Sequence, residues 1–146
     1  MILRRRRLPP ALQPAFDAFV GVVGDVERAK AALTASVPST RFAGRPLLES
    51  LLEFEEALGA AEAGMQGWRR PEVEDAWRAA DAGLRQARDR AYRLRTEGPD
   101  PGGFEGVIGL IGDLLAPLEP FVDAREAFRR LRRPGAPAGS LPSSPS

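Results

Sequence analysis

Glycines recur in the stretch GGFEGVIGLIGDLLAPLEPF, from Gly102 to Phe121, at a spacing that a phosphate-binding loop or a close-packing helix face would use. A Walker-type loop needs a lysine and a serine or threonine after its glycines, but Gly112 is followed by Asp113 and two leucines. A dinucleotide-binding loop needs a preceding strand and the pattern G-x-G-x-x-G, and the stretch has neither. The glycines therefore do not predict a nucleotide site.

The absence of cysteine and histidine limits the chemistry that the chain can perform. Disulfides, thiol nucleophiles and thiolate metal sites need cysteine, and histidine is the commonest general base and metal ligand. Carboxylates do cluster at helical spacing, in two groups: Glu49, Glu53 and Glu56, and Glu72, Glu74 and Asp75. A di-iron bundle, however, pairs such carboxylates with Glu-x-x-His motifs. We interpret both groups as solvated acidic faces and predict a protein that is not an enzyme, without cofactor, metal or small-molecule substrate.

Four segments must carry these residues, and each has the periodicity of an amphipathic helix. Apolar residues repeat at alternating steps of three and four across 12–37, 46–68 and 71–95, which is the heptad pattern of an apolar seam. Each seam of about 22 residues predicts a rod of roughly 33 Å. The fourth segment covers 103–132, and no segment shows the alternation typical of a strand.

Short connections between helices of similar length favour antiparallel neighbours. The sequence therefore predicts an all-α fold, an up-down antiparallel four-helix bundle over 11–133. Its fourth helix is expected to be kinked or split near Pro117 and Pro120, because an interior proline removes a helix hydrogen bond. Residues 1–10 are expected to form a basic arm, and residues 134–146, rich in proline, glycine and serine, a disordered tail.

Composition and the first residues bear on the origin and location of the protein. Arginine supplies 20 of the 21 basic side chains and alanine occurs 23 times, as is typical of bacterial genomes of high GC content. Prolines follow the basic N-terminal residues where a signal peptide has its apolar stretch. No apolar run approaches the ~20 residues that a membrane-spanning helix needs. We therefore expect a cytoplasmic bacterial protein.

Charge is segregated along the chain. Two runs near its ends carry positive charge: Arg4, Arg5, Arg6 and Arg7, and Arg129, Arg130, Arg132 and Arg133. The residues between the two runs hold 13 basic and 20 acidic side chains. Both termini of an up-down bundle emerge at the same end, so the runs are expected to form one basic pole. Trp68 and Trp77 are expected at the opposite end, as apolar caps.

Such a basic pole has two possible ligands, nucleic acid and an anionic membrane surface, both of which it would contact through phosphate groups. The acidic middle of the chain would repel a long phosphate backbone. The arginine runs also lack the interleaved aromatic residues of a single-strand binding groove.

The small residues of the fourth segment share one side in a helical projection at 100° per residue. The candidate partner surface on this side consists of Gly106, Gly109, Gly112, Ala116, Pro117 and Pro120, with Ala124 and Ala127 beyond it. Each interior glycine lowers helix stability by about 1 kcal/mol relative to alanine, and proline by about 3 kcal/mol. Three interpretations stay open: drift on an exposed face, close docking of another helix, or a weak helix that opens to expose its apolar side.

Two cations lie within apolar stripes, Lys30 in the first segment and Arg125 in the fourth. Either could fix helix register, with Glu55 or Glu62 as possible partners, could hold an anionic ligand, or could extend its charged end to water.

No motif identifies a family. We expect a non-enzymatic helical-bundle module for protein interaction (an adaptor, assembly factor or regulator) that contacts a protein partner or a second copy through its fourth helix. The alternative is a nucleic-acid or anionic-membrane-surface binder that works through its arginine-rich ends.

Overall fold

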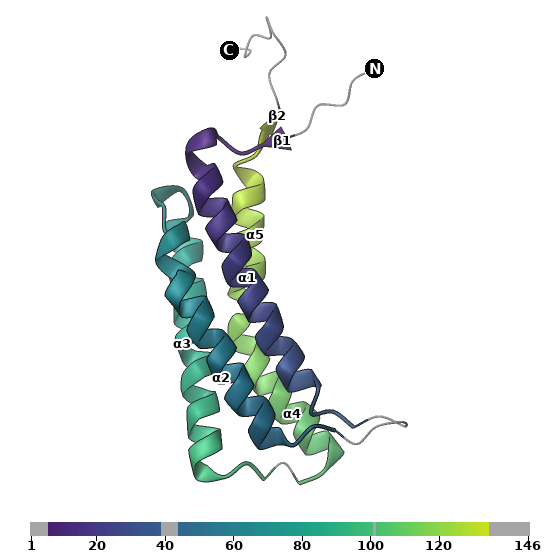
Figure 1. Cartoon of the computed structure of the whole chain (residues 1–146). Coiled ribbons are helices and arrows are strands. Elements are labelled where there is room, and N and C mark those ends of the chain that lie inside the picture. The colour runs from purple at the N-terminus through teal and green to yellow at the C-terminus, as the bar shows by residue number, and fades with distance from the viewer. Residues whose placement is uncertain (1–5, 39–43, 101, 135–146) are drawn as a thin grey trace, which may run out of the picture.

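The computed structural model describes residues 6–38, 44–100 and 102–134 and confirms the predicted up-down four-helix bundle (Figure 1). Three rods are single helices, and the fourth consists of two helices in line. The helices are α1 (Gln13–Thr34), α2 (Leu47–Gly64), α3 (Glu74–Glu97), α4 (Phe104–Leu115) and α5 (Pro120–Arg130). Among the described residues, no helix is long and apolar enough to cross a membrane.

Short 3-10 helices begin, end or connect the rods. They are η1 (Pro10–Leu12), η2 (Met65–Trp68), η3 (Pro71–Val73) and η4 (Ala116–Leu118). At the end of the bundle where the chain termini lie, β1 (Arg6–Arg7) pairs antiparallel with β2 (Arg133–Pro134). Each of these strands is only two residues long, which is too short to produce an alternating pattern in the sequence. Residues 1–5 of the predicted arm and 135–146 of the predicted tail lie outside the described residues.

Local sequence signals explain where the helices begin and end. Pro14 lies in the first turn of α1. Backbone N–H groups in a first turn have no carbonyl partner within the helix, so proline removes no hydrogen bond there. In α3, Glu74 and Asp75 lie in the first turn and Arg95 in the last, so the charges complement the helix dipole. The loop between α3 and α4 begins at Gly98, whose φ of 87° favours glycine and ends α3.

Trp68 is the centre of an aromatic cluster in the half of the bundle that contains the termini. Its side chain is fully buried, and its ring lies 4.9 Å from that of Phe19 and 6.1 Å from that of Phe128. Trp77 is also buried, and its indole N–H donates to the carbonyl oxygen of Met65 at 2.7 Å. This cluster joins α1, α3, α5 and η2 through contacts that bury large apolar areas.

The position of Trp68 and Trp77 contradicts the expectation that they cap the opposite end. In an up-down bundle, the turn between the second and third helices lies at the same end as both termini, as Figure 1 shows. The two indoles are also inside the core rather than over its end.

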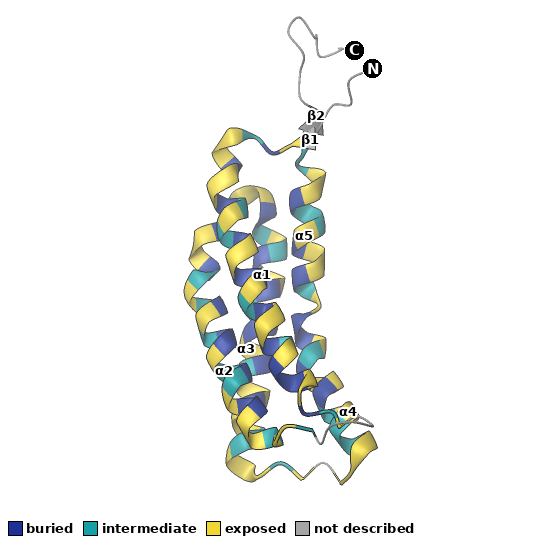
Figure 2. Cartoon of the chain, turned by 45° about the vertical axis from the view of Figure 1, so that its right-hand side comes forward, coloured by how far each residue is buried: buried dark blue, intermediate teal, exposed yellow. Residues whose placement is uncertain are grey.

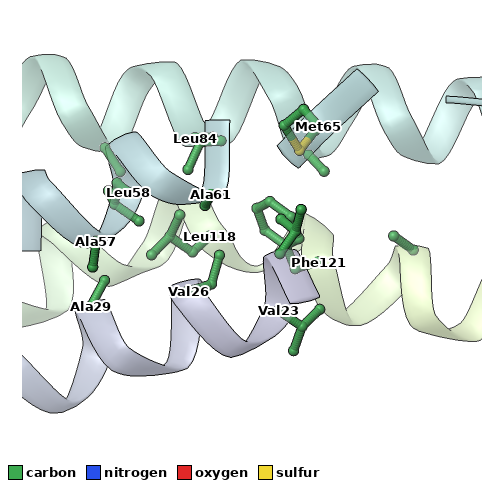
Figure 3. Packing of buried hydrophobic residues seen from close by; sticks show 14 of the residues in the cluster. Val23, Val26, Ala29, Ala57, Leu58, Ala61, Met65, Leu84, Leu118 and Phe121 are labelled. Atoms are coloured by element: carbon green, nitrogen blue, oxygen red, sulfur yellow. The ribbon is translucent and has the colours of Figure 1, made fainter. Parts of the chain in front are cut away.

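Below the aromatic cluster, smaller residues fill the core. Figure 3 shows Leu118 of the fourth rod between Ala61 of α2 and Val26 of α1. Leu84 of α3 is fully buried in the same layer. The alternation of alanine with larger side chains lets the four rods approach without leaving large voids.

The fourth rod is divided where the prolines predict. At this point α3 has a glycine, which leaves room for the backbone of η4. Pro117 is buried against Gly83 of α3, and a Cβ added at Gly83 would overlap the carbonyl oxygen of Pro117. The side chain of Pro120 would lie 3.6 Å from the same Cβ. Only glycine at position 83 allows this approach.

Replacing Gly83 by alanine is predicted to lower the free energy of unfolding by about 1–3 kcal/mol, because the backbone of η4 must move away from α3. Gly24→Ala is the matched control, since Gly24 lies in α1 with open space around an added Cβ. The control should gain up to about 1 kcal/mol through helix propensity. Urea denaturation measures the free energy of unfolding of both variants. Equal stabilisation of the two would contradict the close approach of Gly83 to Pro117.

Candidate functional site

The most exposed apolar surface of the fourth rod lies on α4. Of its 12 residues, two are buried, Ile111 and Leu114. Phe104 is 57% exposed and Ile108 44% exposed, and Figure 2 shows α4 largely outside the buried core. The apolar face of α4 is therefore only partly buried. This face is wider than the part that α1 and α3 cover, so that Phe104 and Ile108 stay exposed.

A groove of about 720 Å³ lies between α4 and the second half of α3. Its lining residues combine apolar side chains with charges of both signs: Arg90, Arg93, Leu94, Glu97, Asp100, Gly106, Gly109, Leu110, Asp113 and Leu114. Arg90 reaches across it and donates to the backbone carbonyl of Asp113 at 2.9 Å. An apolar floor with polar rims is the type of surface that accepts an amphipathic helix.

The glycines of α4 leave room on this surface. Gly106 and Gly109 line the groove, and Gly112 is exposed one turn further along. An added Cβ at Gly109 or Gly112 would meet no atom within 4 Å. Ala116 is exposed as well. These four members of the candidate surface are therefore accessible, and the absence of side chains at the glycines would let another helix approach the backbone closely.

The two prolines of the candidate surface do not belong to it. Pro117 is fully buried and Pro120 is half-buried, and both approach Gly83. Ala124, placed on the same side by the projection, is fully buried too. The projection assumed one continuous helix of constant rotation, whereas the 3-10 turn at Ala116–Leu118 rotates α5 relative to α4.

The α3 wall of the groove was not found from the sequence. Arg90, Arg93, Leu94 and Glu97 recur at steps of three and four, so the pattern shows that they share one side of a helix. It does not show which neighbouring helix that side faces. The order of the rods in the folded bundle supplies this information.

Both carboxylate groups lie at the surface, where Glu49, Glu53 and Glu74 make ion pairs and the other three members are exposed. Arg45 pairs with both Glu49 and Glu53. Glu74 accepts hydrogen bonds from Arg69 at 2.9 Å and from Arg78 at 2.7 Å. Within the described ranges, no group of three or more acidic side chains is arranged to hold a metal ion.

The two glutamates considered as partners of Lys30 form ion pairs with arginines of α3 instead. Glu55 pairs with Arg95, whose Nε donates at 2.5 Å, and Glu62 pairs with Arg88. Lys30 is half-buried and lies 3.8 Å from Glu27, one turn earlier on α1. Of the alternatives for Lys30, the structure therefore shows an ion pair within α1 and not the interhelical pairing with Glu55 or Glu62.

The structure brings described members of the two arginine runs to one end. Arg6 and Arg7 in β1 pair with Pro134 and Arg133 in β2, while Arg4 and Arg5 lie outside the described residues. Arg129 and Arg130, on α5, are exposed. The guanidinium of Arg132 lies over the ring of Phe16, 5.0 Å from its centre. The β1–β2 pairing thus juxtaposes residues that are far apart in the sequence.

Comparison of the chain with protein-family models, with curated proteins and with solved structures finds no match.

The pKa of Glu74 supplies a test of the polar geometry beside Trp77. Hydrogen bonds from Arg69, and then from Arg78, lower the pKa of Glu74 from 4.5 to about 2. A lowered pKa stabilises the fold above the unfolded value of 4.5, and this contribution is lost as pH falls through 2. NMR titration of the Glu74 carboxyl should give a midpoint near 2. Arg69→Gln should raise that midpoint, and an ordinary midpoint in the unmodified protein would contradict the arrangement.

Proposed function

We propose that the protein is a non-enzymatic helical-bundle module for protein interaction, and that α4 with the α3–α4 groove is its contact surface. The supporting observation is that α4 exposes Phe104 and Ile108 beside a glycine face with open space. Exposed large apolar side chains that adjoin a groove with charged rims are typical of surfaces that bind another protein.

The occupant that best complements this surface is α4 of a second copy. The charged side chains of α4 are both acidic, Glu105 and Asp113, whereas the facing wall of the groove carries Arg90 and Arg93, with Glu97 and Asp100 further along it. In a two-fold arrangement, the acidic face of each α4 meets the arginines of the other copy. The exposed Phe104 and Ile108 side chains would then be covered by the same contact.

The glycine face would determine how closely the two copies approach. Without side chains at Gly109 and Gly112, the backbones of two helices can come closer than ordinary helix packing allows, so that dispersion contacts increase. This contact would use residues that make no close contact within their own chain. It would also offset the low helix propensity of α4, since association favours the helical conformation.

Substitution of either glycine by glutamate is predicted to abolish self-association. We expect the unmodified chain to form a dimer whose fraction rises with concentration, and Gly109→Glu and Gly112→Glu to be monomers at the same concentrations. Sedimentation equilibrium measures this directly, and circular dichroism confirms that the variants are folded.

Gly21→Glu and Gly24→Glu are matched controls, because both glycines lie on the exposed side of α1 with open space around an added Cβ. They add the same charge and should still form dimers. Unchanged association of the Gly109 and Gly112 variants would show that the glycine face of α4 is not the contact surface. An unmodified chain that is monomeric throughout would contradict a second copy as the occupant.

A further inference from the structure

Three arginines at the C-terminal end of the fourth rod are not used by the α4 surface. Arg125 and Arg129 lie one turn apart on the same side of α5, and Arg132 follows two residues after the helix ends at Arg130. Together with Phe16 and Val20 of α1, they line a hollow of about 280 Å³. Three guanidinium groups therefore border one small space between α1 and α5.

This hollow has no acidic lining residue. Arg129 lies 3.6 Å from Glu126, an exposed pair within α5 that solvent screens. Arg125 and Arg132 make no ion pair with any residue in 6–38, 44–100 or 102–134. The ring of Phe16 holds the guanidinium of Arg132 at the edge of the hollow. At least two of the three cations are thus available to a ligand.

The opposite side of α5 is different in charge. Arg130 lines a second hollow with Asp123 and with acidic residues from the start of α3. The carboxylates there are Glu72, Glu74, Asp75 and Asp123. The arginines of the predicted basic pole are therefore divided between two surfaces, and a long polyanion that crossed α5 would meet these carboxylates. A compact anion in the α1–α5 hollow would not.

We propose that the hollow between α1 and α5 binds a phosphate group, supplied by a membrane lipid headgroup or by a free phosphate compound. Guanidinium groups present paired N–H donors that match phosphate oxygens, so that two or three of them can share one phosphate. The guanidinium of Arg132 already lies over the ring of Phe16, and the ring of Phe128 packs against the same ring at a steep angle with 5.4 Å between centroids, so the Phe16 ring is engaged within the chain. The ligand is therefore recognised through its phosphate.

Exposed apolar residues border the arginines. Val20 lines the hollow and is 51% exposed, and Val122, three residues before Arg125 on α5, is 57% exposed. Arginines flanked by exposed apolar side chains are suited to the boundary between lipid headgroups and acyl chains. This proposal is independent of association through α4, because it uses other helices and other residues.

The test compares a double variant with a control of equal charge. Arg125→Gln with Arg129→Gln removes two cations of the hollow, whereas Arg28→Gln with Arg130→Gln removes two exposed cations elsewhere on the same helices. Binding of inorganic phosphate to the full chain is measured by calorimetry at low ionic strength. Binding to phosphatidylcholine vesicles that contain phosphatidic acid, or phosphatidylserine at the same surface charge, is measured by co-sedimentation.

We expect Arg125→Gln/Arg129→Gln to weaken phosphate binding about tenfold or more, and the control to weaken it less than about threefold. Tighter binding to phosphatidic acid than to phosphatidylserine vesicles identifies a lipid headgroup as the source. Binding of inorganic phosphate without vesicle binding identifies a free phosphate compound.

Three results would overturn the proposal: no phosphate or vesicle binding, equal weakening by the two double variants, or tighter binding to single-stranded DNA that Arg125→Gln/Arg129→Gln leaves unchanged. Circular dichroism and thermal denaturation of both double variants establish that they are folded. The mutated side chains are exposed, so loss of the fold is not expected.

Discussion

The close approach of Gly83 to Pro117 is the constraint on which the shape of the fourth rod depends. The carbonyl of Pro117 occupies space that any side chain at position 83 would fill. Because α3 accepts the 3-10 turn at this point, α5 can return to the core and bury Phe121 and Phe128 against the aromatic cluster. On the other side of the turn, α4 buries Ile111 and Leu114 and leaves Phe104 and Ile108 exposed. The Gly83–Pro117 contact thus lies at the boundary between α5, which packs into the aromatic cluster, and the more exposed α4.

Much of this fold follows from the sequence. The three heptad seams predict α1, α2 and α3 with their ends within a few residues, because burying an apolar stripe requires the helical period along its whole length. Pro117 and Pro120 predict where the fourth helix divides. A single glycine, Gly83, in the seam between Ala80 and Leu84, is a signal of the close approach, although only the structure shows what approaches it.

The remainder depends on relations between helices, which a pattern within one helix does not contain. A projection carried through Pro117 placed Ala124 on the outer face, since it could not include the rotation at η4. Glu55 and Glu62 were expected to meet Lys30 of α1, but the register of the bundle places them beside Arg95 and Arg88. The arginine runs predicted one basic pole, and their described members do lie at one end, but the sequence does not show that α5 separates an acid-free hollow from an acid-lined one. The sequence therefore predicted the part of the candidate site that the glycines of α4 form. It did not predict the wall of the groove that α3 forms.

Few side chains of α4 are buried, and we propose that a second copy covers its exposed face. Residue-resolved amide hydrogen exchange, measured at low and at high protein concentration, tests it most directly. At low concentration, amides of α4 should exchange faster than those of α5, because fewer of its side chains are buried. At high concentration, protection should rise in α4 and along the groove while that of the exposed side of α1 stays constant. Equal protection of α4 and α5 at both concentrations would contradict the claim.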